Sequence, residues 1–285
     1  MEYLDTNLNL VTEEIRESGV ILDYLSFTFK PENEFKYISR SKEDLKVFHK
    51  LPIDYFFELF GEDLTNFLKS YGVYRPFGTN HYGKSIKVCA PKDDKGKSLI
   101  KAESVSAKGY SVDFIINYCE PDDDNLYDYA YNMGVNVSIP SHFIKVFMQL
   151  CHFDKDDLPS FLSWLYRNDC KASRIDLCWD DFSMRYTPHD YIREEVCGNL
   201  VTRCSKGGFL HSKQNEGGTF ALGSKDTKYL RIYDKNYESG GSIPSVRYEV
   251  MYTGKFAKLL HQNLLKCGTQ INSAKLICVP HLRRF

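Results

Sequence analysis

The segment SRIDLCWDDF, residues 173–182, is predicted to be a long β-strand that decides how the C-terminal part of the chain folds. Successive side chains of a strand point to opposite faces of the sheet. One face carries Arg174, Asp176, Cys178 and Asp180, and the other carries Ile175, Leu177, Trp179 and Asp181. The second set is mostly apolar and is expected to face the core. The first set leaves a strongly ionic face.

Three further strands are predicted downstream of this segment. They are GGTFALGS (217–224), KYLRIYDK (228–235) and PSVRYEVMY (244–252), joined by turns that contain Gly, Asp or Ser. Two helices accompany them. One runs from 188 to about 197, with Thr187 as the N-cap, Pro188 at its first position and Asp190 in its first turn. The other covers 254–267, where apolar residues recur at helical spacing.

The N-terminal part repeats this mixture of strands and helices. Strands are predicted at ILDYLSFTF (21–29) and at 109–118. Helices are predicted from residue 41, over 54–72, over 141–151 with Ser141 as N-cap, and over 158–168. ILDYLSFTF and SRIDLCWDDF each enter their strand with an apolar residue followed by Asp, at Leu22-Asp23 and Ile175-Asp176. The chain is therefore interpreted as two similar α+β halves, residues 1–170 and 171–285.

Composition restricts the class of protein. The 285 residues are 42% hydrophobic, which is enough for a packed core, and no apolar run approaches the length of a membrane span. The first residues are acidic and polar, unlike a signal or transit peptide, so a cytoplasmic location is expected. None of the nine cysteines forms a C-x-x-C pair, and buried reduced thiols are expected. The histidines show no metal-binding spacing.

Charge is unevenly distributed along the chain. The net charge of −1 argues neither for nor against nucleic acid as a partner. Residues 113–144 hold six acidic side chains and no Lys or Arg, whereas residues 254–285 hold six basic side chains and no Asp or Glu. The basic residues are Lys255, Lys258, Lys266, Lys275, Arg283 and Arg284. This segment is either a solvated helix face and tail or a phosphate-binding patch.

Strand alternation gathers chemistry-bearing side chains on three of the C-terminal strands. Arg231, Tyr233 and Lys235 share one face of their strand, and Arg247 and Glu249 share one face of theirs. Neighbouring strands lie about 5 Å apart. If the ionic faces align in one sheet, these side chains converge with Asp176 and Asp180.

Two interpretations of this convergence stay open. Clustered carboxylates suit Mg²⁺ or Mn²⁺, and nearby cations with a metal would favour the phenolate of Tyr233, whose ordinary pKa is about 10. Tyr233 would then attack a phosphodiester whose charge is held by Arg and Lys. Alternatively, the sheet has an ordinary solvated face with cross-strand ion pairs, and Tyr233 is one of 20 unremarkable tyrosines.

Four motifs favour the first interpretation. SRIDLCWDDF, GGTFALGSK, YLRIYDKNYE and VRYEVMYTGKFA, in this order, resemble the replication initiation factor family. This family comprises initiators of rolling-circle replication in plasmids and some phages, together with related relaxases of conjugative elements. The resemblance is specific over residues 173–258 and weaker from residue 21. It implies an α+β fold of antiparallel sheets with helices packed on one face, and some members dimerise.

The resemblance also implies an activity, which is site-specific nicking and joining of a DNA strand. Tyr233 matches the nucleophile, which holds the 5′-phosphate and leaves a free 3′-hydroxyl. Asp176, Asp180 and Asp181 match the family's acidic strand, and Glu249 matches its glutamate. The implied ligands of Mg²⁺ or Mn²⁺ are Asp176, Asp180 and Glu249, where alternation favours Asp180 over Asp181. Glu249 is also the candidate general base.

The remaining expectations concern DNA and partners. Arg231 and Lys235 are expected to contact the scissile phosphate, and Arg174, Arg247, Lys255 and Lys258 are expected to bind DNA. The implied partners are an origin with a hairpin or single-stranded nick site, a host helicase and polymerase, and a second copy in a homodimer, but no membrane. The alternatives are a conjugative relaxase, a metal nuclease in which water attacks, and a non-catalytic DNA-binding regulator.

Overall fold

The structure is a computed structural model that describes residues 20–31, 51–76, 84–88, 114–119, 132–201, 207–212, 215–266 and 281–282. The chain forms two compact units. Unit 1 combines residues 1–24 with residues 174–285, and unit 2 comprises residues 25–173. The boundary crosses two strands, β1 (Ile21–Phe29) and β6 (Cys170–Asp181). The division into two consecutive halves, residues 1–170 and 171–285, stays a prediction. The two compact units are divided differently, because residues 1–24, which include the start of β1, belong to unit 1.

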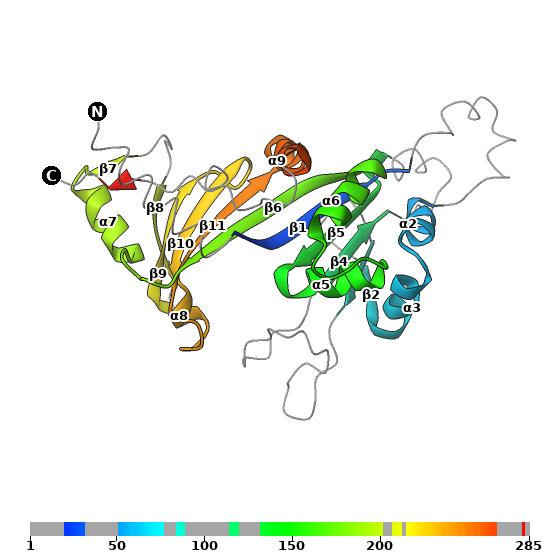
Figure 1. Cartoon of the computed structure of the whole chain (residues 1–285), viewed down its shortest axis with the longest axis horizontal. Helices are drawn as coiled ribbons and strands as arrows, with labels where there is room; N and C mark the ends of the chain where they lie inside the picture. Colours follow the sequence, from blue (N-terminus) through cyan, green and yellow to red (C-terminus); the bar gives the residue numbers. More distant parts are fainter. Residues whose placement is uncertain are drawn as a thin grey trace, which may run out of the picture. The chain divides into compact units, whose positions relative to one another are not determined.

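Unit 1 is built on an antiparallel sheet with the strand order β6-β11-β10-β9-β8 (Figure 1). Its other strands are β11 (Val246–Thr253), β10 (Lys228–Asp234), β9 (Asn215–Gly223) and β8 (Gly207–Ser212). β7 (Leu200–Val201) and β12 (His281–Leu282) pair separately. The helices are α7 (Pro188–Val196), α8 (Lys235–Glu238) and α9 (Gly254–Lys266).

One face of the unit 1 sheet is packed against α7. Trp179 and Tyr248 stack with ring centroids 5.0 Å apart, and Tyr191 of α7 stacks on Phe220 at 5.7 Å. The Tyr191 and Tyr248 hydroxyls lie 3.2 Å apart, so these buried phenols satisfy each other. α7 begins where the sequence predicts, because the Thr187 hydroxyl accepts a hydrogen bond from the amide N of Asp190. The prediction that this sheet face lies in the core is confirmed.

Unit 2 has the strand order β2-β3-β4-β5-β1, and its first four strands pair antiparallel. These strands are β2 (Gly72–Pro76), β3 (Lys84–Val88), β4 (Phe114–Tyr118) and β5 (Val135–Pro140). The helices are α2 (Pro52–Phe60), α3 (Glu62–Tyr71), α5 (Ser141–Leu150) and α6 (Leu158–Arg167). The core is aromatic: Phe60 stacks on Phe27 at 5.8 Å and meets Trp164 of α6 edge-on at 5.1 Å.

Several element boundaries differ from the sequence prediction. The single helix predicted over 54–72 is two helices, because Gly61 adopts a positive φ of 93° that an α-helix cannot contain. Ser141 is the first residue of α5, and Pro140 takes the N-cap position. α6 is capped by Asp157, whose carboxylate accepts from the amide of Ser160 at 3.1 Å. The helix predicted from residue 41 lies outside the described residues.

The predicted fold class, α+β with antiparallel sheets, is confirmed. Within the described part of the chain, no helix combines the length and the apolar character needed to cross a membrane. The five described cysteines are free thiols. Cys151, Cys170 and Cys178 are buried as predicted, but Cys197 is exposed just after α7, so the prediction of burial is wrong for that residue.

Candidate functional site

The three strands with ionic faces are neighbours in the unit 1 sheet. β11 lies between β6 and β10, and the register aligns their side chains in cross-strand rows. In one row Glu249 stands opposite both Cys178 and Arg231. In the next row Arg247 stands opposite both Asp180 and Tyr233. The convergence that alternation predicts is therefore present in the sheet.

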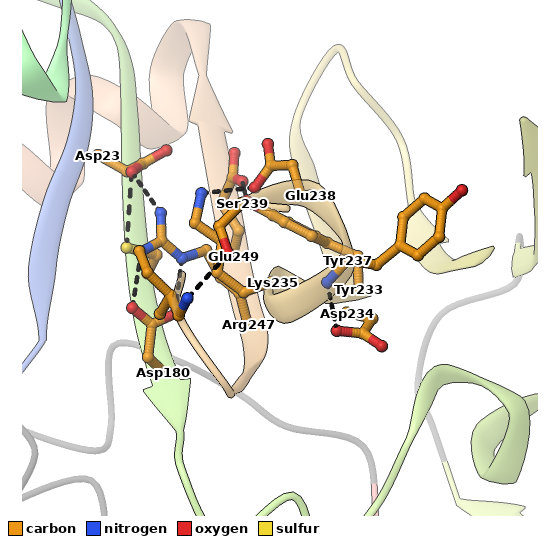
Figure 2. A network of polar contacts seen from close by, with 12 residues as sticks. Asp23, Asp180, Tyr233, Asp234, Lys235, Tyr237, Glu238, Ser239, Arg247 and Glu249 are labelled. Carbon is orange, nitrogen blue, oxygen red and sulfur yellow. Dashed lines mark hydrogen bonds and ion pairs between the residues drawn. The ribbon is translucent and has the colours of Figure 1, made fainter. Parts of the chain in front are cut away.

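Tyr233 meets a carboxylate directly. Its hydroxyl donates to Oε2 of Glu249 at 3.1 Å, and Arg231 pairs with the other oxygen, Oε1 (Figure 2). Glu249 is 1% exposed, whereas Tyr233 is half-buried and Arg231 is more exposed. A buried carboxylate is thus held between a phenol and a guanidinium.

The cations around Tyr233 are paired with neighbouring carboxylates. The Arg231 guanidinium and the Lys235 ammonium each lie 5.9 Å from the centre of the Tyr233 ring, but they are paired with Glu249 and Glu238. Burial raises the pKa of Tyr233 well above its ordinary value, the charges of Glu249 and Glu238 add to the rise, and Arg247 opposes it. The expectation that cations together with a metal favour the phenolate stays a prediction, and burial of the ring works against it.

Arg247 forms a buried clamp. Its Nε and Nη2 donate to the two carboxylate oxygens of Asp180 at 2.6 Å each, and its Nη1 donates to Oδ1 of Asp23 at 2.9 Å (Figure 2). Asp23 lies on β1 and also accepts from the thiol of Cys178 at 3.7 Å. Burial raises the pKa of Asp23, Glu249 raises it further, and Arg247 lowers it. Arg247 is 9% exposed, so its charge is used within the protein.

Asp23 is the site residue that the sequence analysis missed. The signal that could have found it is the apolar-Asp start shared by ILDYLSFTF and SRIDLCWDDF. This similarity places an acid at a matching position of β1.

Asp176 is held by an arginine of its own strand. Nε of Arg174 donates to Oδ1 of Asp176 at 2.8 Å, Nη2 pairs with Oδ2, and the guanidinium lies 4.2 Å from the centre of the Tyr24 ring. Burial raises the pKa of Asp176, and Arg174 lowers it. About one third of the Arg174 side chain is exposed, so it reaches the surface while Asp176 does not.

The three predicted metal ligands do not point at a common position. Asp176, Asp180 and Glu249 are each bound by a different arginine: Arg174, Arg247 and Arg231. Among the residues that the structure describes, no group of three or more His, Cys, Asp or Glu side chains is arranged to hold a metal ion. The arrangement thus does not fit a preformed three-carboxylate site. Asp181 accepts from the amide and the hydroxyl of Ser183 at 2.9 and 2.6 Å, so it stabilises the turn after β6.

The predicted phosphate-binding lysines occupy two helices. Lys235 is the first residue of α8, because β10 ends at Asp234, whose side chain caps the helix. It still lies beside the Tyr233 ring and pairs with Glu238. Lys255 and Lys258 are exposed on α9. Lys275, Arg283 and Arg284 of the basic segment lie outside the described residues.

Comparison with known proteins agrees with the resemblance found in the sequence. Residues 170–284 match the family model for replication initiation factors. This part of the chain is similar to the replication initiation factors. The predicted resemblance is thereby confirmed for the segment that carries β6, β10 and β11. No curated protein matches the chain.

A solved structure extends the similarity of fold to most of the chain. It is a rolling circle replication initiator protein from Geobacillus stearothermophilus, which aligns with a TM-score of 0.54 and 16% sequence identity. The alignment covers 87% of this chain and 80% of that chain. At this identity the match establishes the fold. It also accounts for both units, whereas the replication initiation factor match covers unit 1 alone apart from the first residues of β6.

Proposed function

We propose that this protein initiates rolling-circle DNA replication by nicking one strand of its origin with Tyr233. The similarity to replication initiation factors and to an initiator structure supports the general activity. The observation that carries the chemical proposal is the hydrogen bond from the Tyr233 hydroxyl to the buried carboxylate of Glu249, between two cations. A neutral phenol with a base on its proton is a nucleophile ready for activation.

The proposed reaction is a transfer of one phosphodiester linkage. Glu249 takes the proton of Tyr233 as the phenolic oxygen attacks the phosphorus. The bond from phosphorus to the 3′-oxygen breaks, and that oxygen takes up a proton to become a free 3′-hydroxyl. The 5′-phosphate stays on Tyr233 as a phosphotyrosyl diester, whose energy is available for the later rejoining step.

Proton transfer and phosphate binding are coupled in this arrangement. Arg231 is paired with Glu249 before reaction. When Glu249 accepts the proton it loses its negative charge, and the attraction that holds Arg231 is lost with it. Arg231 is then free to bind the oxygen atoms of the phosphate, whose charge develops at the same moment. Lys235, on the other side of the ring, is the second candidate for this contact.

Replacement of Glu249 by glutamine tests its role as the base. Gln can still accept the hydrogen bond from Tyr233 but cannot take the proton. The rate of covalent adduct formation is therefore expected to fall by about 10²- to 10⁴-fold. Glu238→Gln is the matched control, since Glu238 lies near Tyr233 but pairs with Lys235. Glu249→Gln reacting at the wild-type rate would exclude Glu249 as the base.

A requirement for Mg²⁺ or Mn²⁺ stays a prediction. When bound, such an ion would polarise the phosphoryl oxygen, but here it would first have to displace arginines from Asp176, Asp180 or Glu249. Adduct formation is expected to stop in excess EDTA and to return when Mn²⁺ is added beyond the chelator. An unchanged rate in EDTA would contradict the requirement and leave Arg231 and Lys235 as the candidates for stabilising the phosphate charge.

One assay separates the proposed activity from its alternatives. The protein is incubated with a library of hairpin and single-stranded oligonucleotides plus Mn²⁺, and covalent protein–DNA adducts are resolved on a denaturing gel. An adduct that is absent in Tyr233→Phe supports the proposal. Cleavage without an adduct indicates a nuclease in which water attacks, and binding alone indicates a regulator.

The proposed partners follow from the product. A free 3′-hydroxyl is a primer for a host polymerase, and continued synthesis requires a host helicase to separate the strands. The same chemistry serves a conjugative relaxase, and a homodimer would supply a second tyrosine. Reconstituted replication of a circular template carrying the selected oligonucleotide distinguishes an initiator from a relaxase.

A further inference from the structure

Two large aromatic side chains are exposed at the end of the unit 1 sheet that holds Tyr233. Phe182, directly after β6, is 61% exposed, and Tyr237 of α8 is 41% exposed. β6 and β10 both end opposite Val246, the first residue of β11, so Phe182 and Tyr237 follow strands that finish at the same end of this sheet. Tyr233 is the last residue but one of β10 and lies at that same end.

The backbone that carries Tyr237 is fixed, although its ring is free of the core. Asp234, next to the nucleophile, accepts a hydrogen bond from the amide of Tyr237 at 2.9 Å. The following turn is closed by bonds from the amides of Ser239 and Gly241 to Lys235 and Asn236, at 2.8 and 2.7 Å. In Figure 2 the Tyr237 ring points away from the group around Glu249. The backbone at Tyr237 is therefore fixed, and its ring does not pack against that group.

Neither exposed ring takes part in an aromatic contact within the described residues, in contrast to Trp179, Tyr191 and Tyr248 on the core face. Single exposed aromatics are common on protein surfaces. These two differ in lying at the same end of the sheet as Tyr233, which is bordered by cations. Exposed rings combined with cations that follow a phosphate backbone are the two features of a site for single-stranded nucleic acid.

We propose that Phe182 and Tyr237 are the residues that stack on unpaired bases next to the scissile phosphate. The proposal rests on the proposed function for the position of the scissile phosphate. A base within a duplex has both faces covered by its neighbours, so an aromatic side chain stacks readily only on a base that is unpaired and splayed out. The two rings would thus select single-stranded or extruded DNA without reading its sequence.

Binding to strands with and without bases tests this. In a Tyr233→Phe background, which prevents covalent reaction, fluorescence anisotropy measures the affinity for an oligonucleotide of about 12 thymidines and for an abasic strand of equal length. Tyr237→Leu and Phe182→Leu are each expected to weaken binding of the thymidine strand about tenfold and to leave the abasic strand unchanged. Tyr237→Phe, which keeps the ring, is expected to bind as the parent does.

Tyr166→Leu is the matched control, because Tyr166 is a 48% exposed tyrosine of unit 2. Equal losses on the thymidine and abasic strands, or the same loss in Tyr166→Leu, would overturn stacking. Equal losses on a duplex of the same length would do so as well. These outcomes are independent of nicking: a wild-type protein that forms no adduct refutes the proposed function, while the ratio of thymidine to abasic binding still decides the stacking proposal.

Discussion

Tyr233→Phe is expected to abolish covalent adduct formation and strand nicking, with a loss of about 10⁴-fold or more. The substitution removes one oxygen atom, the proposed nucleophile, and keeps the ring between Arg231 and Lys235. Binding of the oligonucleotide is expected to change little, because phosphate and base contacts remain. Adduct yield on a denaturing gel and affinity by anisotropy separate these two effects.

Two other tyrosines provide matched controls for this substitution. Tyr229 shares its strand and its sheet face with Tyr233, and Tyr237 follows four residues later on α8. Tyr229→Phe and Tyr237→Phe are both expected to retain the adduct. Loss of the adduct in Tyr237→Phe with retention in Tyr233→Phe would assign the nucleophile to α8 instead of β10 and would refute the mechanism proposed for Glu249.

Arg247→Gln is expected to have the largest effect on stability. The substitution removes the guanidinium that binds Asp180 and Asp23. The side chains of these two residues are only 9% and 21% exposed, respectively. Removing one partner of a buried ion pair costs about 3–5 kcal/mol in the free energy of unfolding, because an uncompensated charge stays buried. Urea unfolding followed by circular dichroism measures the change. Arg193→Gln, at an exposed arginine of α7, is the control and is expected to change stability little.

The stability loss in Arg247→Gln also depends on pH. Without Arg247 the pKa of Asp23, already raised by burial, rises further. A carboxyl whose folded pKa lies above its unfolded pKa stabilises the fold fully below about pH 4, and that contribution is lost as pH rises through the folded value. The loss is therefore expected to be smaller in acid than at neutral pH. Adding Asp180→Asn should recover part of the stability, and a double variant as unstable as Arg247→Gln would contradict this explanation.

The sequence predicted the site to the extent that strand alternation determines it. Alternation assigns Asp176 and Asp180 to one face of their strand, and Arg247 and Glu249 to one face of theirs. The register of β6, β11 and β10 then brings these faces together. It does not determine where each side chain points on that face. The arginines could therefore not be predicted to lie on the carboxylates, which is why the pairing with Arg174, Arg231 and Arg247 was not foreseen.

Long-range contacts, helix capping and glycine conformation account for the features that the sequence did not predict. Asp23 and Arg247 are 224 residues apart, and no local pattern predicts their contact. The predicted strand 228–235 includes Lys235, but β10 ends one residue earlier, at Asp234. The carboxylate of Asp234 accepts a hydrogen bond from the amide of Tyr237, so Lys235 begins a helix instead. Gly61 divided the helix predicted over 54–72 because its conformation, and not its position in the apolar pattern, decides continuity.

The discontinuity of unit 1 has a consequence for biosynthesis. Asp23 leaves the ribosome 224 residues before Arg247. Since domains generally fold as they are made, starting from the N-terminus, the start of β1 has to wait for its partner until those residues have been added. Newly made chains would consequently acquire the complete cluster only after β11 has been synthesised, and a fragment that begins at residue 171 would never acquire it.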